Sequence, residues 1–351
     1  MPTPPARQHP LHFAAVITPA PETASQGRWH PALARRADFD ALERQVHLAR
    51  TLERGKFDAV LFSDAAAPAG DPSVLAGAIA YVTSHLGIAV TASARQEDPL
   101  SFARRVSALD HASGGRVTWN LTGDLTGDWL EEYADVTYKL WEGSWDEDAL
   151  DQAGRAEPGG WGGKVHRINH QGARYQVTGP HPVSPSPQRT PLLFQTGATA
   201  AGRAFAAGHA EAVLLGSPSP AAAADDIAAF RTLVADRGRL PRDIKFFQAV
   251  HLAAAGIAGA PENLADELAN WRAAGIDGVA LVGPGDRERY EEFVSQVAPV
   301  LQRRGLMQRQ YAAGPLRGKL FGGSGRLPWR HPAARYRGAF APQRLEPASR
   351  A

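Results

Sequence analysis

The chain has 351 residues, 44% of them hydrophobic, a formal net charge of +2 and no cysteine. This length and apolar content allow one large domain with a sizeable core, and the lack of cysteine excludes disulfides, thiolate metal sites and cysteine nucleophiles. The sequence has neither an apolar run long enough for a membrane helix nor a signal peptide at its proline-rich start, so we expect a cytoplasmic protein.

Apolar runs and helical periodicities alternate along the chain after residues 1–10, which we expect to be a disordered tail. Continuous apolar runs predict buried strands, and apolar residues three or four positions apart predict helices. The predicted strands span residues 11–17, 57–62, 86–91, 116–121, 191–195, 212–215, 245–252 and 278–282. The predicted helices span residues 39–54, 73–84, 100–111, 128–141, 198–208, 220–236, 262–274 and 287–303, with Asp38 as the N-cap of the first.

Eight successive βα units predict a (β/α)₈ TIM barrel over residues 11–305. No GxGxxG follows the first strand, which disfavours an open dinucleotide-binding sheet. Residues 142–190 are rich in glycine and proline and form a predicted insertion between the fourth helix and the fifth strand, with a hairpin at 167–177. The predicted fold is therefore an α/β barrel with one insertion.

Residues 306–351 form an extended basic C-terminal arm. From Arg303 onwards, eleven arginines and lysines stand against one acid, Glu346. Such a charge could bind nucleic acid or a membrane, but the apolar spacing of Leu316 and Leu320 favours an arm packed on protein. We therefore expect neither a nucleic-acid nor a membrane partner.

Ligands of parallel barrels bind at the carboxyl ends of the strands. After the fifth predicted strand, Gly197, Ala198 and Thr199 begin a helix, whose free N–H groups could hold a phosphate; alternatively, Thr199 is only the helix cap. Asp64 is either a cap or a ligand contact, and a buried Asn120 needs a hydrogen-bond partner. Hydroxyls and amides at these ends suit a polar planar ligand, and no metal site is expected.

Seven segments read together resemble one family. They are residues 53–60 (ERGKFDAV), 109–116 (LDHASGGR), 119–120 (WN), 139–145 (KLWEGSW), 185–188 (PSPQ), 195–202 (QTGATAAG) and 301–306 (LQRRGL). In this order they resemble the bacterial-luciferase-like flavin monooxygenases. The branch they resemble contains nitrilotriacetate monooxygenase, dibenzothiophene-sulfone monooxygenase and the large subunit of pristinamycin synthase.

The resemblance implies a two-component monooxygenase. A separate NAD(P)H-dependent flavin reductase would supply reduced FMN, and O₂ would oxygenate a small organic substrate in a homodimer or higher homo-oligomer, with the segment after Gly305 as the dimer-contacting arm. The residues implied at the cofactor are Asp64, Thr91, Ser93, Asn120, Gly197, Ala198 and Thr199, and Thr122 joins them at the same strand end. His30 matches a position facing the active site and is the candidate for proton handling; the alternative is an exposed loop histidine.

The chain also departs from the family pattern. The family's His-containing stretch after the Trp-Asn strand is missing, because residues 122–128 lead directly into the next helix. A long family segment between the seventh strand and seventh helix is absent as well. We therefore expect a shallower pocket and weaker FMN binding. Two alternatives stay open: a trimmed flavin- or ligand-binding relative without monooxygenase activity, and an F420-dependent or redox-neutral biosynthetic enzyme.

Overall fold

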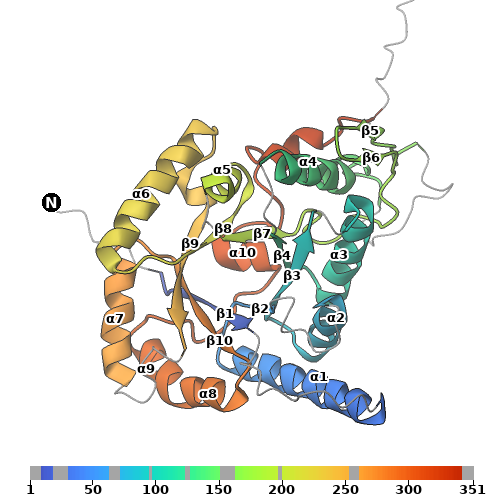
Figure 1. The fold of residues 1–351 in the computed structure, drawn as a ribbon. Helices are drawn as coiled ribbons and strands as arrows, with labels where there is room; N and C mark the ends of the chain where they lie inside the picture. The colour runs from blue at the N-terminus through green and yellow to red at the C-terminus, as the bar shows by residue number, and fades with distance from the viewer. Residues whose placement is uncertain are drawn as a thin grey trace, which may run out of the picture.

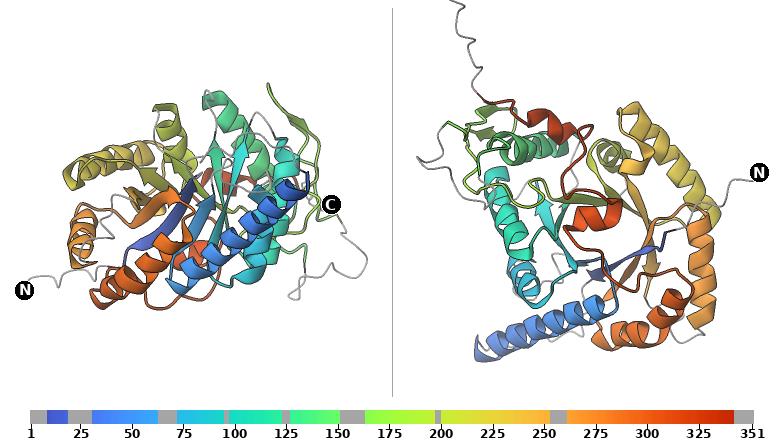
Figure 2. Two further views of the ribbon diagram at one scale, coloured as in Figure 1. Left: turned by 60° about the horizontal axis from the view of Figure 1, so that its bottom comes forward. Right: turned by 180° about the vertical axis from the view of Figure 1, so that it is seen from behind.

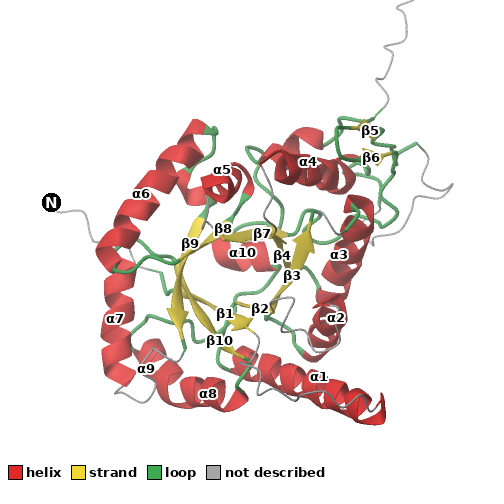
Figure 3. Cartoon of the chain, in the orientation of Figure 1, coloured by secondary structure: helices red, strands yellow, loops and turns green. Residues whose placement is uncertain are grey.

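The computed structural model describes residues 9–18, 31–62, 72–94, 97–122, 127–150, 163–196, 200–252 and 261–341. Eight parallel strands close into a barrel in the order β1-β10-β9-β8-β7-β4-β3-β2. Helices surround the strands (Figures 1 and 3). The predicted TIM barrel is therefore confirmed.

The barrel strands are β1 His12–Thr18, β2 Ala59–Phe62, β3 Gly87–Ser93, β4 Val117–Thr122, β7 Leu192–Thr196, β8 Ala212–Leu215, β9 Lys245–His251 and β10 Gly278–Pro284. The helices around them are α1 Pro31–Arg54, α2 Pro72–Val82, α3 Pro99–Ser113, α4 Gly127–Tyr138, α5 Ala200–His209, α6 Pro220–Asp236, α7 Pro261–Ala273, α8 Arg287–Glu292 and α9 Ala298–Arg303. The predicted hairpin is present as β5 His170–Gln171 and β6 Gln176–Val177. None of the described helices is both long and apolar enough to cross a bilayer.

Most helices differ from their predicted bounds by a few residues, and two depart from the prediction further. The first begins at Pro31, so Asp38 lies within the helix and the prediction that it is the N-cap was wrong. Proline at the first helical position loses no hydrogen bond, and the following alanines, leucine and arginines are good helix formers. The predicted last helix is divided by a π-helical turn, Phe293–Val297, just before Pro299, which lacks the N–H that a regular helix would use.

Side chains of the barrel strands alternate between two apolar clusters. The lumen cluster contains alanines, leucines and two phenylalanines, Phe194 and Phe247, which are in edge contact at 5.4 Å. A Cβ added to Gly278 would lie 2.5 Å from the Phe247 ring, so glycine is needed there. The outward-facing cluster, which includes Trp119, packs against the helices. The barrel is therefore a filled core, as in other barrels of this kind.

The C-terminal arm packs on the amino-terminal end of the barrel. Its helix α10 (Leu316–Phe321) lies inside the ring of strands in Figure 1 and again from behind in Figure 2. The Leu316 N–H donates to the Gly115 carbonyl at 2.8 Å, just before β4. A Cβ on Gly87 would lie 2.8 Å from the Leu316 side chain. The tail therefore closes this end of the barrel within the same chain.

Candidate active site

Four of the predicted contact residues lie side by side at the carboxyl ends of two neighbouring strands. Thr91 of β3 pairs in register with Asn120 of β4, and Ser93 pairs with Thr122. The remaining predicted site residues lie outside the described part of the chain: His30, Asp64, Gly197, Ala198 and Thr199. The structure thus brings four of the nine predicted residues together, and the other five remain a prediction.

The Asn120 side chain occupies the lumen face of β4. Its neighbours Trp119 and Leu121 pack in the outer cluster, and strand side chains alternate. Asn120 is 8% exposed, and its Oδ1 has no hydrogen-bond partner among the described residues. A buried amide oxygen without a partner is costly, so this atom indicates a contact with a ligand or with a segment outside the described residues.

Two glutamines that were not among the predicted site residues join neighbouring strands near the same end. The Gln195 amide donates from β7 to the Leu121 carbonyl of β4 at 2.9 Å. The Gln248 amide donates from β9 to the Ser217 carbonyl, beyond β8, at 3.0 Å. Both are at most 5% exposed. Their signal in the sequence is a polar residue inside an apolar strand, which has few other uses than such a link.

His251 is a further residue that the site prediction omitted. It ends β9, where it pairs in register with Val282, and it is exposed at the carboxyl end of the barrel. Strand alternation places it on the same face as Phe247, toward the lumen. Histidine is the side chain that enzymes use most often as a general acid or base, so His251 is a second candidate for proton handling beside His30.

The first turn of α3 is fixed next to Ser93. Asp98 caps this helix by accepting from the N–H groups of Leu100 and Ser101, both at 3.0 Å. Arg105, on the same helix, pairs with Glu97 at 2.5 Å. Both acids are engaged in these local contacts. The described residues contain no cluster of three or more His, Asp or Glu side chains that could hold a metal ion.

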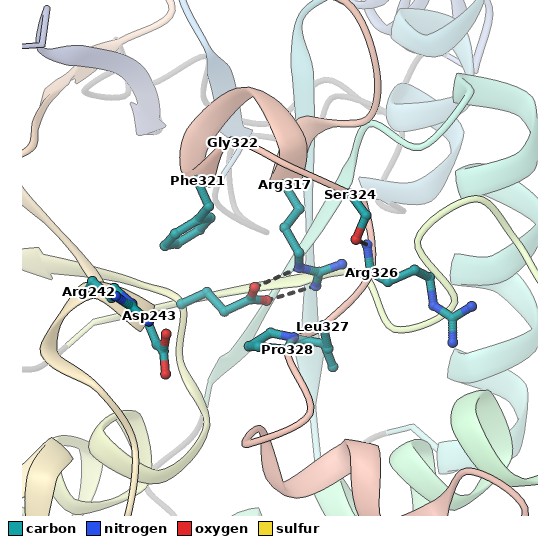
Figure 4. A pocket seen from close by; sticks show the side chains of 10 residues that line it. Arg242, Asp243, Arg317, Phe321, Gly322, Ser324, Arg326, Leu327 and Pro328 are labelled. Carbon is teal, nitrogen blue, oxygen red and sulfur yellow. Dashed lines mark hydrogen bonds and ion pairs between the residues drawn. The ribbon is translucent and has the colours of Figure 1, made fainter.

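A cavity of about 300 Å³ lies at the opposite end of the barrel, beside α10 (Figure 4). Its wall contains the ion pair of Arg317 with Glu211, in which both side chains are almost fully buried. Barrel enzymes carry their chemistry at the other end, and both charges are already paired. We therefore assign this cavity to the packing of the arm and not to the active site.

Comparison with known proteins agrees with this geometry. The luciferase-like monooxygenase family matches residues 2–123 and 124–294. The long-chain alkane monooxygenase of Geobacillus thermodenitrificans is 33% identical over an alignment of 420 positions, which covers 89% of this chain and 94% of the relative. The dimethyl-sulfide monooxygenase of Hyphomicrobium sulfonivorans is 30% identical and covers 90% of this chain and 91% of the relative.

Solved structures share the whole barrel. A long-chain alkane monooxygenase superposes with a TM-score of 0.79 at 31% identity, over 93% of this chain and 99% of that chain. A riboflavin lyase, solved with modified FMN and riboflavin, superposes with a TM-score of 0.78 at 26% identity, over 93% and 99%.

The branch indicated by the sequence motifs is also confirmed. Relatives include dibenzothiophene-sulfone monooxygenase of Rhodococcus erythropolis (32% identical, 70% of this chain and 62% of the relative), a nitrilotriacetate monooxygenase component of Aminobacter aminovorans (30%, 53% and 50%) and a pristinamycin IIA synthase chain of Streptomyces pristinaespiralis (29%, 61% and 54%). The family match covers most of the chain, and the barrel carries its polar residues where such enzymes bind their ligands. The chain is therefore an enzyme that belongs to the luciferase-like monooxygenase family.

Proposed function

We propose that the protein is the oxygenase component of a two-component FMN-dependent monooxygenase. It receives reduced FMN from a separate NAD(P)H-dependent flavin reductase and uses O₂ to oxygenate a small organic substrate. The observation that carries the proposal is the buried, unpartnered Asn120 Oδ1 on the lumen face, beside Thr91, in a family of monooxygenases.

The polar groups at this end suit a flavin. The pyrimidine edge of a flavin ring presents an N–H between two carbonyl oxygens, and a primary amide such as that of Asn120 can both accept from and donate to such an edge. The hydroxyls of Thr91 and Ser93 can do either as well. Helix α5 starts at Ala200, four residues after the end of β7, so its first N–H groups suit the FMN phosphate, with Gly197, Ala198 and Thr199 in the connecting turn.

When bound, reduced FMN would supply the two electrons that activate O₂. In this proposal Asn120, Thr91, Ser93 and Thr122 hold the ring, and Asp64 lies near it. His30 or His251 exchanges the proton that oxygen transfer to the substrate requires. Proton exchange at one of these imidazoles predicts a pH-dependent turnover, whereas FMN binding depends on the amide and hydroxyl groups.

A trimmed flavin- or ligand-binding protein is the second candidate function. One observation favours it: the alignment with the alkane monooxygenase needs 420 positions, although this chain has only 351 residues. The relative therefore has segments that this chain lacks. Loss of covering segments would expose the flavin to water, which favours side reactions over oxygen transfer.

The first experiment measures flavin binding. Purified protein is titrated with FMN and, without oxygen, with reduced FMN, and F420 serves as the competing cofactor. Asn120→Ala should weaken FMN binding about tenfold, the value of one buried hydrogen bond, while Asn270→Ala, at an exposed position of α7, should leave it unchanged. Thr199→Glu should abolish binding by repelling the phosphate. Absence of binding by the wild type at saturating flavin would exclude the proposal.

The second experiment tests oxygen transfer. The protein is supplied with FMN, a flavin reductase, NADH and ¹⁸O₂, and a panel of alkanes, sulfides and sulfones is screened for labelled product by mass spectrometry. A labelled product that requires both the reductase and this protein supports the monooxygenase. If the protein binds flavin tightly but no compound of the panel gives a labelled product, the result favours the second candidate.

We extend the proposal to the assembly and the location. A homodimer or higher homo-oligomer, formed in part by the arm after Gly305, should elute from size exclusion at a multiple of the 37.5 kDa chain mass. A cytoplasmic location should appear on fractionation of the source cells. Elution as a monomer over the whole concentration range would contradict the homo-oligomer. Recovery of the protein in the membrane fraction would contradict the cytoplasmic location.

A further inference from the structure

The tip of the inserted hairpin is fixed to helix α4. The Glu132 carboxylate of α4 accepts from the backbone N–H groups of Arg174 at 3.0 Å and Tyr175 at 2.9 Å. Figure 1 shows the hairpin β5-β6 beside this helix. A Cβ on Gly172 would lie 2.1 Å from the carboxylate, so any larger residue here would push Glu132 away from the tip. The insertion therefore has a defined place at the edge of the barrel.

The charge state of Glu132 keeps this contact strong. Burial alone would raise the pKa of Glu132, but the hydrogen bonds from Tyr175, Arg174 and His170 bring that pKa below its usual value. The carboxylate is therefore ionised at neutral pH, and hydrogen bonds to an ionised acceptor are stronger than neutral ones.

The Tyr175 side chain extends from this tip toward strand β3. Its ring makes edge contacts with Tyr133 at 5.7 Å and Trp129 at 6.1 Å. Its hydroxyl donates to the carbonyl of Ala94. Burial raises the pKa of Tyr175 to about 12, so the phenol keeps its proton and remains a donor at neutral pH.

Ala94 directly follows Ser93, the last residue of β3. It is 2% exposed, and the Glu97 N–H donates back to the Ser93 carbonyl at 3.1 Å. A hydrogen bond to Ala94 therefore restrains the strand end that carries Thr91 and Ser93. The hairpin thus contacts the strand end that carries the predicted flavin contacts, although Tyr175 follows Ala94 by about 80 residues in the sequence.

We propose that Tyr175 is a positioning residue for the flavin site. Its hydroxyl holds the end of β3 so that Thr91 stays in register with Asn120, and Ser93 with Thr122. The insertion, anchored through Glu132 and Gly172, delivers the tyrosine to this point. The inference rests on the proposed function for its flavin, but the restraint on β3 stands on the contacts alone.

The test compares two tyrosines of the same chemistry. Tyr175→Phe removes one hydroxyl at the carboxyl end of the barrel. Tyr311→Phe removes a hydroxyl that donates to the Phe57 carbonyl at 2.7 Å, at the opposite end. We expect similar, small falls in melting temperature for both variants, but about tenfold weaker FMN binding only for Tyr175→Phe. Gly172→Ala, which pushes the Glu132 carboxylate away from the tip and keeps the tyrosine, should weaken FMN binding as well.

Hydrogen exchange without flavin separates this inference from the proposed function. Amide exchange in the peptide that contains residues 93–98 should be faster in Tyr175→Phe than in the wild type and unchanged in Tyr311→Phe. Unchanged exchange, or FMN binding equal to that of Tyr311→Phe, would overturn the positioning role. Faster exchange in a protein whose wild type binds no FMN would support the restraint on β3 and overturn only the flavin assignment.

Discussion

At the scale of residues, the ion pair of Arg317 and Glu211 links the C-terminal arm to the barrel. Nε of Arg317 lies 2.6 Å from Oε1 of Glu211, and Nη2 lies 2.8 Å from Oε2. The side chains are only 2% and 4% exposed. Two parallel hydrogen bonds offset much of the cost of burying both charges. The interaction joins the arm to the start of β8, so its loss affects two distant segments of the chain.

Arg317→Ala should lower the free energy of unfolding by about 3–5 kcal/mol, because it leaves the buried Glu211 carboxylate without its hydrogen-bonded cation. Urea denaturation measures this change. The double variant Arg317→Met with Glu211→Met should lose less than Arg317→Ala alone, since no buried charge remains. Arg304→Ala is the control: it breaks an exposed pair with Asp266 and should cost less than about 1 kcal/mol. Equal losses in Arg317→Ala and Arg304→Ala would contradict the assignment.

At the scale of elements, helix α10 is stable only through its contacts. It has six residues, too few for a helix that forms by itself in water. Leu316 and Leu320 are 1% and 8% exposed and belong to the lumen cluster. The apolar lumen of the barrel is therefore completed by side chains from the far end of the sequence.

Leu316→Ala and Leu320→Ala should each lower the free energy of unfolding by about 2–5 kcal/mol, the usual range for a buried leucine. Leu233→Ala, at a position of α6 that is 39% exposed, should cost at most about 0.5 kcal/mol. Thermal or urea unfolding gives the comparison. FMN affinity of the folded variants should be unchanged, because α10 lies at the opposite end from the strand ends. A loss of FMN affinity matching the loss of stability would indicate that the arm also shapes the flavin site.

At the scale of the whole molecule, the βα rhythm was sufficient to predict the barrel, and two elements were predicted to the residue. Strand β8 is Ala212–Leu215, and helix α6 is Pro220–Asp236. The bounds of helix α6 could be predicted because Ser219 caps the helix and Pro220 directly follows this cap. Helix α10 was not predicted, because six residues carry too little periodicity and its partners are spread over strands from the whole length of the barrel sequence.

The candidate site likewise contains contacts that the sequence predicts and contacts that it does not. The neighbourhood of Thr91 and Asn120 follows from two adjacent parallel strands, which sequence order alone suggests. The contact of Tyr175 with Ala94 could not be foreseen, because it depends on how the insertion folds back on α4. The links made by Gln195 and Gln248 depend on strand register, which no local pattern fixes in a two-sided buried strand.

The pH dependence of folding belongs to the whole molecule, because buried histidines and paired acids act together. Burial, with the charge of His111 added, lowers the pKa of His181 to about 4. Burial also places the pKa of His331 well below its usual value, and the charge of Arg239 adds to this. Hydrogen bonds from Lys139 and Tyr336 lower the pKa of the Asp135 carboxyl, although its burial acts in the opposite direction.

The direction in which the free energy of unfolding changes with pH follows from the number of protons that the folded and unfolded chains bind. Between about pH 6.5 and pH 4 the unfolded chain binds protons at both histidines that the folded chain excludes, so the free energy of unfolding falls as the pH decreases. Below about pH 4 the acids add to this loss, because the unfolded chain takes up protons there before the folded one.

Urea denaturation from pH 7 to pH 4 should show a steady decline in the free energy of unfolding, of which His181 contributes about 3 kcal/mol. His181→Gln should flatten the decline above pH 4, and His9→Gln, at an exposed position, should leave it unchanged. An equally steep decline in His181→Gln would contradict the prediction, because it would show that this histidine takes up its proton in the folded protein as readily as in the unfolded chain.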